Sequence, residues 1–532
     1  MRAFTPILVL LAAMVPLKAE RFYSDDPLID EPAPMRVDRA ARRKVDDMYD
    51  LFSHTLALPG EHPTKGKTIP ARAVTTLGEP LNGAWYRSRH WTRPLSIDEL
   101  VRGPGVGNPP EAGGKWSVIA AKNQGVTPGF RIRDSRGTRY VLKFDPTTNP
   151  EMATAADVIT SRFFHALGYH VPEYYLVSFQ PEQLVVDPKA KIPDQRGVDR
   201  PMTSRDVNEI LLKVPRQKDG SYRAVASLFL SGQDLGPFRY YGTRSDDPND
   251  TVPHEHRRDL RGLFVFCAWL GHEDSRAINS LDMLVEESGR KFVKHYLIDF
   301  GSTLGSASTK SNGARSGNEY LFAFKPAMAE IASLGLYVPR WARVHYPDLP
   351  SVGRFSADIF EAENFRPEYR NPAFLNRLPD DTYWAARQVM EFTDEQIAAI
   401  VGTGQYSDRR APDWVTKCLI ERRNRIGKTY FAKVLPLDRF EVRAGRLEFE
   451  DLAVKHKIEP SRQYQWTWSE FDNQADRHSP IAGAASAEIP RSPAEFVSAS
   501  IHAGDAGKTV RVYLRRRGAD WQVVGIERSW SR

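Results

Sequence analysis

Residues 295–306 read HYLIDFGSTLGS, and this stretch carries the strongest structural signal in the chain. One aromatic and two aliphatic residues lead into Asp299, and Phe300 and Gly301 follow it. This is the pattern of a buried strand that ends by presenting one carboxylate at a turn. By itself the stretch fits an ordinary strand-ending aspartate as well as a metal ligand, so its neighbours in the sequence must separate the two interpretations.

A second motif lies upstream, in the stretch GHEDSRAIN at residues 271–279. Asp274 stands five positions before Asn279, and Arg276 lies between them. The stretch follows a long apolar helix predicted from residue 257, which Gly271 ends. The spacing D-x-R-x-x-N also occurs by chance in unrelated chains, so this motif gains its meaning from the elements around it.

The elements further upstream are strands and one helix. Three strands are predicted first, at residues 116–121, 130–133 and 140–144. Lys143 lies on the third strand, and a helix follows in which Asn149 is suited to the cap and Pro150 to the first turn. Two more strands are predicted at residues 173–179 and 222–230, with a polar insertion at 187–204 between them.

In this order the motifs resemble the protein-kinase-like superfamily, whose catalytic loop has the form D-x-[KR]-x-x-N and whose metal loop is DFG. The resemblance covers residues 116 to about 306 and is greatest to the atypical branches: phosphatidylinositol kinases, HipA-like kinases and secretory-pathway kinases. It implies an α+β, bilobal kinase-like fold, with a β-rich N-lobe at residues 116–235 and a helical C-lobe at 236–435. HED stands where His-Arg-Asp is usual, no Ala-Pro-Glu follows, and the glycine turn is not GxGxxG, so an ordinary Ser/Thr or Tyr protein kinase is disfavoured.

The resemblance assigns roles to the two loops. Asp299 and Asn279 would be the ligands of Mg²⁺ or Mn²⁺, because both offer hard oxygen donors. Asp274 would accept the proton of the acceptor hydroxyl, and Arg276 would clamp the γ-phosphate.

The same resemblance assigns the residues that bind ATP. Lys143 would reach the α- and β-phosphates. The backbone of the glycine turn would cover the triphosphate through three residues, Gly125, Thr127 and Gly129. Glu151 is the expected helix acid that pairs with Lys143, and Asp157 is the alternative. For Glu151 a purely structural role is also open, since acids are favoured in any first helical turn.

Three functions fit this set of residues. The first is an exported atypical kinase that transfers the γ-phosphate of ATP to a hydroxyl of a protein, glycan or lipid. The second is nucleotidyl transfer, of the AMPylation type, on the same fold. The third is a nucleotide- or glycan-binding scaffold without turnover. Acids and bases alternate along the chain despite a net charge of +7, so no nucleic-acid partner is expected.

The N-terminal region predicts export. Residues 1–19 combine a positive Arg2 with about thirteen mostly apolar residues and a small Ala19, which is typical of a cleavable signal peptide of a bacterial-type exported protein. No later stretch has the roughly 20 apolar residues that a spanning helix needs. We therefore expect a periplasmic or secreted protein, in which residues 20–115 form an extension that wraps the core.

The C-terminal part, residues 436–532, changes to an alternating pattern that predicts a small antiparallel, sandwich-like β domain. Tyr464, Trp466 and Trp468 fall on one face of a strand, where they line either the core of this domain or a carbohydrate-stacking platform. Cys267 and Cys418 are either two buried free thiols or one bridge. The sequence HEH at residues 254–256 lacks zinc-ligand spacing and predicts a solvated turn.

Overall fold

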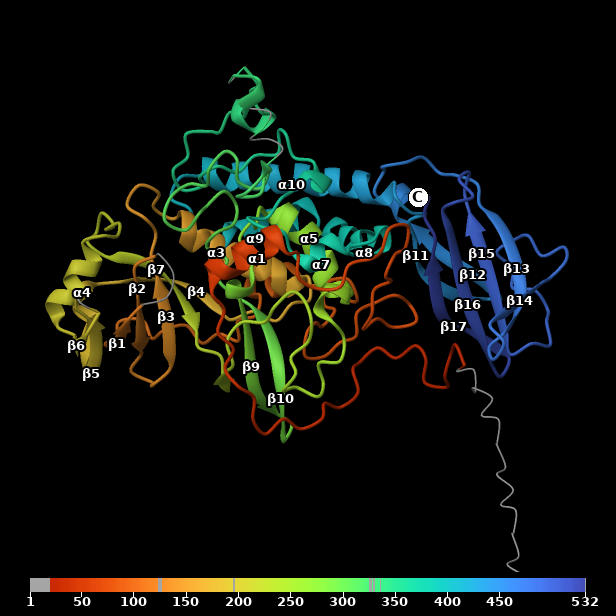
Figure 1. Cartoon of the computed structure of the whole chain (residues 1–532), viewed down its shortest axis with the longest axis horizontal. Coiled ribbons are helices and arrows are strands. Elements are labelled where there is room, and N and C mark those ends of the chain that lie inside the picture. Colours follow the sequence, from red (N-terminus) through yellow and green to blue (C-terminus); the bar gives the residue numbers. More distant parts are fainter. Residues whose placement is uncertain are drawn as a thin grey trace, which may run out of the picture.

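The computed structural model describes residues 20–122, 127–194, 197–324, 328, 331–334 and 336–531. A large sheet lies at one end of the molecule, a helical region occupies the centre, and a second β-rich region lies at the other end (Figure 1). The predicted signal peptide lies outside the described residues. No described helix is long and apolar enough to cross a membrane.

The large sheet has seven strands in the order β4-β7-β3-β2-β1-β5-β6. Their bounds are β1 Trp116–Ala121, β2 Gly129–Arg133, β3 Arg139–Lys143, β4 Tyr174–Phe179, β5 Leu184–Pro193, β6 Asp199–Pro201 and β7 Tyr222–Leu228. The three strands that the sequence predicts first are present and pair antiparallel. The predicted polar insertion contains strands: its residues form much of β5, which pairs with β1, and all of β6, which pairs with β5, because backbone pairing needs no apolar pattern.

The helix that follows β3 in the chain packs against β4 and β7 of the large sheet. This helix, α3, spans Met152–Ala166 and is buried over almost its whole length. Asn149 does not cap it, contrary to the prediction, because its amide nitrogen donates to Ser311 Oγ at 3.0 Å and to the Pro350 carbonyl oxygen at 2.8 Å. Glu151 takes the position before the helix in a left-handed conformation, with φ of 69°.

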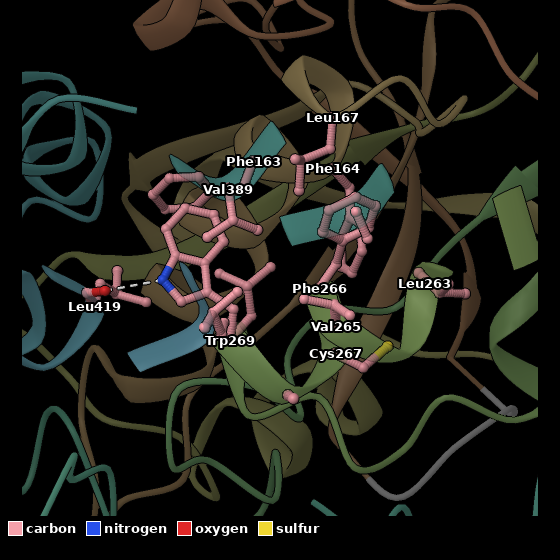
Figure 2. Close-up of a cluster of buried hydrophobic side chains, with 14 of the residues drawn as sticks. Phe163, Phe164, Leu167, Leu263, Val265, Phe266, Cys267, Trp269, Val389 and Leu419 are labelled. Carbon is pink, nitrogen blue, oxygen red and sulfur yellow. Dashed lines mark hydrogen bonds between the residues drawn. The ribbon is translucent and has the colours of Figure 1, made fainter. Parts of the chain in front are cut away.

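The helical region surrounds α5, Arg258–Leu270, whose residues are all buried and whose end is Gly271 in the left-handed region, as predicted. Its other helices are α7 Pro372–Leu375, α8 Pro379–Met390, α9 Asp394–Gly402 and α10 Arg410–Phe431. Figure 2 shows the core they share with α3, in which Phe163 packs near Trp269 and the Trp269 indole N–H donates to the Leu419 carbonyl oxygen at 2.9 Å. Cys267 and Cys418 are buried free thiols, which settles the alternative left open by the sequence.

A short sheet below the helices carries the two predicted loops (Figure 1). Its strands are β8 Gln233–Asp234, β9 Ser280–Glu287 and β10 Arg290–Leu297. β9 and β10 form a hairpin whose turn, Ser288 and Gly289, has positive φ at both residues. Asp274 and Asn279 therefore precede this hairpin and Asp299 follows it, so the hairpin brings both loops to the same end of the sheet.

The C-terminal region contains a hairpin and a five-stranded antiparallel sheet. The hairpin consists of β11 Leu437–Arg443 and β12 Arg446–Asp451, followed by α11 Leu452–Lys455. The sheet consists of β13 Gln465–Asp472, β14 Arg477–Pro480, β15 Phe496–His502, β16 Thr509–Arg517 and β17 Asp520–Arg528. Trp468 is fully buried, and Tyr464 and Trp466 pack on the same apolar cluster, so these aromatic residues line the core and form no exposed platform.

The N-terminal extension reaches across the whole molecule (Figure 1). Its helices are α1 Asp47–Leu56 and α2 Ile97–Arg102, and one further small helix of the N-lobe, α4, spans Ser204–Leu211. The solvated turn predicted for HEH is wrong: His254 and His256 are buried, and the Nε2–H of His256 donates a 2.8 Å hydrogen bond to a carboxylate oxygen of Glu61 in the extension. The extension covers this turn and removes it from water.

Candidate active site

Three charged side chains from separate elements converge between the large sheet and the helical region. Lys143 Nζ, at the end of β3, lies 2.7 Å from a carboxylate oxygen of Asp157 on α3. The same Nζ lies 2.9 Å from Asp299 Oδ1, beyond the end of β10. Burial alone would lower the pKa of Lys143, but the charges of Asp157 and Asp299 outweigh it and raise that pKa above its ordinary value. Lys143 is therefore charged and held in place.

The Glu151 prediction is corrected by this arrangement. Glu151 Oε2 accepts a hydrogen bond from the Ser407 backbone N–H at 2.9 Å, because the left-handed conformation before α3 turns the residue toward α9 and α10. Asp157, buried six residues later on the helix, makes the ion pair with Lys143 instead. The sequence signal for Asp157 was weak, since an aspartate in mid-helix has no local role that marks it.

Asp299 is fixed through its backbone. Its φ of 62° lies in the left-handed region, which non-glycine residues seldom adopt outside turns and functional sites. Its N–H donates to the Tyr174 hydroxyl at 3.1 Å, and the preceding N–H, of Ile298, donates to the Asn279 carbonyl oxygen at 3.1 Å. Burial would raise the pKa of Asp299, but the neighbouring Lys143 charge lowers it, so this carboxylate is ionised.

Asn279 and Asp274 form one unit in the loop before β9. The Asn279 side-chain amide donates to the Asp274 carbonyl oxygen at 2.7 Å. Burial raises the pKa of the Asp274 carboxyl, although the Arg276 charge opposes that rise. A carboxylate whose pKa is raised is a stronger base than an ordinary aspartate and is better suited to accept a proton.

Arg276 points into a cluster of acids. Its guanidinium contacts Asp274, lies 2.6 Å from Asp47 at the start of α1 and 2.9 Å from Glu368. The predicted clamp on the γ-phosphate is thus not the arrangement seen, because three carboxylates already occupy the guanidinium. These contacts indicate that Arg276 positions Asp274.

The glycine turn contributes Thr127 and Gly129, whereas Gly125 lies outside the described residues. Gly129 opens β2 opposite Lys143, and a Cβ there would lie 2.2 Å from the Leu142 carbonyl oxygen, so only glycine fits. Thr127 Oγ1 accepts a 2.6 Å hydrogen bond from the Nζ of Lys122.

Lys122 is a second lysine at this site, and sequence reasoning missed it. Burial lowers its pKa, and the charges of Asp299 and Lys143 act on that pKa in opposite directions. Among the described residues no carboxylate forms an ion pair with it. A lysine directly before the glycine turn, at the end of the first strand, was the only available sequence signal.

His272 lies in the loop between α5 and β9, two residues before Asp274. It is buried, and burial lowers the pKa of its imidazole to about 4, so the ring is neutral at pH 7. It makes edge contacts with the rings of Phe164 and Phe300, at centroid distances of 6.0 and 6.1 Å, and these two rings stack on each other. Its Nδ1 has no hydrogen-bond partner among the described residues. These contacts favour a packing role.

The oxygen atoms at this site fit a hard divalent cation. The Asp299 side chain is 41% exposed, and Lys143 contacts only its Oδ1. Among the described residues no donor reaches Asp299 Oδ2 or the side-chain oxygen of Asn279. Oxygen atoms without donors are the ligands that Mg²⁺ or Mn²⁺ takes, so these two residues can hold such an ion.

No protein-family model and no curated protein matches this chain in sequence. Among solved structures, the chain is similar to the proinflammatory kinase CtkA of Helicobacter pylori, at 12% identity and a TM-score of 0.31, covering 59% of this chain and 98% of that one. It is also similar to the Golgi casein kinase in two crystal structures, one with Mn/ADP bound, at 9% and 10% identity and a TM-score of 0.29. Both of these cover 63% of this chain and 74% of that chain.

At these TM-scores the likeness carries no weight by itself, and the fold class follows from the topology of this chain. A β-rich lobe with a strand lysine precedes a buried helix, and a helical lobe presents an aspartate–asparagine loop and an aspartate–phenylalanine–glycine turn around a hairpin. This order defines a bilobal protein-kinase-like fold.

Proposed function

We propose that this protein is an exported atypical kinase that transfers the γ-phosphate of ATP to a hydroxyl group of a protein, glycan or lipid. The observation that carries the proposal is the position of Lys143 between Asp157 and Asp299. In protein kinases, a strand lysine paired with a helix acid holds the nucleotide phosphates, and the aspartate of the metal loop lies beside it. Here an aspartate takes the place of the usual helix glutamate.

The roles of the residues follow from their surroundings. Lys143 and Lys122 bind the phosphates of ATP, and the backbone around Thr127 and Gly129 covers them. Asp299 and Asn279 hold Mg²⁺ or Mn²⁺, which supplies positive charge to the transferring phosphoryl group.

Asp274 accepts the proton of the acceptor hydroxyl. The acceptor hydroxyl binds next to this carboxylate, which takes up its proton as the new O–P bond forms and ADP leaves. Arg276 keeps Asp274 in one orientation through its ion pair, and Asp47 and Glu368 hold Arg276 from the other side.

A labelling experiment tests the reaction. Purified protein with Mg²⁺ and ATP labelled at the γ position should transfer label to a cell-envelope fraction, and Asp299→Ala and Asp274→Asn should each abolish transfer. Glu151→Gln is the matched control and should retain activity, because Glu151 contacts Ser407 and not Lys143. Transfer of label from the α position would establish nucleotidyl transfer instead, and ATP binding without transfer of either label would establish a scaffold.

Export is part of the proposal and has its own support. Arg21 and Phe22 dock on the C-terminal sheet, so cleavage after Ala19 would keep the docked residues and remove only what precedes them. The mass of the protein isolated from its native compartment should correspond to a chain that begins at Glu20. A chain that retains residues 1–19 and resides in the cytoplasm would contradict export while leaving the kinase proposal intact.

A further inference from the structure

An apolar ridge projects from the segment that follows the Asp299 loop. The ridge consists of Phe324, Ile331, Leu334, Leu336, Tyr337 and Val338. Leu334 is 91% exposed and Leu336 is 87% exposed. In Figure 1 the described part of this segment, coloured green to teal, stands out above the helical region. Large apolar side chains in such concentration mark a surface that contacts a membrane or another protein.

The ridge continues toward α1. The rings of Phe52 on α1 and Phe322 stack, with their centroids 6.1 Å apart. Three other apolar side chains of α1 are exposed as well: Met48, Tyr49 and Leu56, at 60%, 66% and 72%. Exposed apolar side chains therefore also occur on α1, the helix that contacts Arg276 through Asp47, and α1 contacts the ridge segment at Phe322.

The charges beside the ridge favour an anionic partner. Residues 331–345 contain Arg340, Arg343 and His345 and no aspartate or glutamate. Arg343 is exposed, and no described acid contacts it. Arg340 forms an exposed ion pair with Glu361 at 2.7 Å, which is weak in water and exchanges readily for another anion.

The aromatic residues favour a lipid partner over a protein. Tyr337 is 50% exposed on the ridge, and Trp341 follows it next to the arginines. Tyrosine and tryptophan prefer the level of the lipid head groups, where an apolar ring meets a polar layer. Aliphatic side chains that project, with aromatic and basic residues behind them, match the structure of a segment that enters one leaflet.

We propose that the ridge inserts into the surface of an anionic lipid bilayer, with Arg340 and Arg343 at the lipid phosphates. The Leu321 N–H donates to the Glu368 carbonyl oxygen at 2.8 Å, and Glu368 contacts Arg276. The base of the ridge is thus bonded to the segment that positions Asp274. Binding to a bilayer would hold the candidate active site at the membrane surface, within reach of lipid head groups and membrane-anchored acceptors. The proposal does not depend on kinase activity.

Vesicle flotation tests this proposal. The purified protein should float with vesicles that contain phosphatidylglycerol and bind phosphatidylcholine vesicles more weakly, since basic segments are attracted to anionic lipids. The double variant Leu334→Asp/Leu336→Asp should bind at least about tenfold more weakly, because charged side chains are excluded from hydrocarbon. Arg343→Glu should weaken binding to the anionic vesicles only.

Two control variants show whether a loss of vesicle binding is specific to the ridge. Leu212→Asp and Val106→Asp alter side chains that are each 81% exposed but lie outside the ridge, so they should bind as the unaltered protein does. Equal melting temperatures would show that all variants fold. The proposal is overturned if the unaltered protein does not float, if the controls lose binding as strongly, or if the ridge proves to join two copies of the chain that the double variant separates.

Discussion

Asp47, the first residue of α1, lies 2.6 Å from the guanidinium of Arg276, 229 positions later in the chain. The N-terminal extension thus contacts the loop that carries Asp274. Because Arg276 also contacts Asp274 itself, the extension takes part in holding the candidate catalytic carboxylate.

Substitution of Asp47 should therefore loosen this loop. We expect Asp47→Asn to lower the free energy of unfolding by about 1 kcal/mol, since the ion pair is partly exposed. Hydrogen exchange should become faster in α1 and in residues 271–279. Asp46→Ala is the control: the Asp46 carboxylate caps α1 without contacting Arg276, so its removal should raise exchange in α1 alone. Unchanged exchange in the loop of Asp47→Asn would contradict the contact.

Replacement of the helix acid should distinguish Asp157 from Glu151. Asp157→Asn removes one of the two carboxylates that hold Lys143, so affinity for ATP with Mg²⁺ should fall by about tenfold or more. Glu151→Gln should bind ATP as the unaltered protein does. Isothermal titration calorimetry measures both constants, and a larger effect at Glu151 would refute the assignment.

The role proposed for Lys122 can be tested by comparing ligands with and without phosphate groups. Its charge is partly buried without an ion pair among the described residues, so a bound phosphate would supply an anion. We expect Lys122→Gln to weaken binding of ADP by about tenfold and to leave binding of adenosine unchanged. Lys115→Gln is the control, because Lys115 directly precedes β1, at the end of that strand away from Lys122, and its Nζ donates to the Glu182 carbonyl oxygen. Equal losses for ADP and adenosine would assign Lys122 a structural role.

The acids around Arg276 should make stability depend on pH. Burial raises the pKa of Glu273 and of Glu368 from 4.5 to about 7. The folded chain therefore holds more protons than the unfolded chain between about pH 4.5 and 7, and this contribution to stability is lost as the pH rises through that window. Glu273→Gln should stabilise the protein by about 1–3 kcal/mol at pH 8 relative to pH 5.

The comparison must be made between the variant and the unaltered protein at each pH. Burial lowers the pKa of His272 to about 4 and that of His165 to about 3, and these groups add stability as the pH rises. Their contribution is common to both proteins and cancels in the difference. Denaturant unfolding at pH 5 and pH 8 gives the values, and a difference that does not change with pH would contradict the assignment.

Phe22 should hold the extension on the C-terminal sheet. It packs with Phe471, Phe496 and Tyr513, over Gly525, where a Cβ would lie only 2.5 Å from its ring. We expect Phe22→Ala to destabilise this region by about 3 kcal/mol. Tyr23→Ala, at a side chain that is 52% exposed, should have little effect. Limited proteolysis would show release of the N-terminal residues in the first variant, and equal resistance of both variants would oppose this role.

The sequence by itself determined the order of the elements and the two loops. Periodicity and turn residues are local signals, and for that reason five strands of the first lobe, β1 to β4 and β7, and the buried helix that ends at Gly271 were predicted correctly. Asp299 and Lys143 were singled out by motif and order, and the structure brings these two residues together.

The tertiary structure decided which side chains meet. The partner of Lys143 depends on how α3 lies against β3, and one left-handed residue turns Glu151 away while Asp157 faces inward. The direction of Arg276 depends on acids far away in the chain, and the burial of the HEH turn depends on the extension that covers it. Such contacts join residues whose local sequences carry no common pattern, so only the packing of the folded chain determines them.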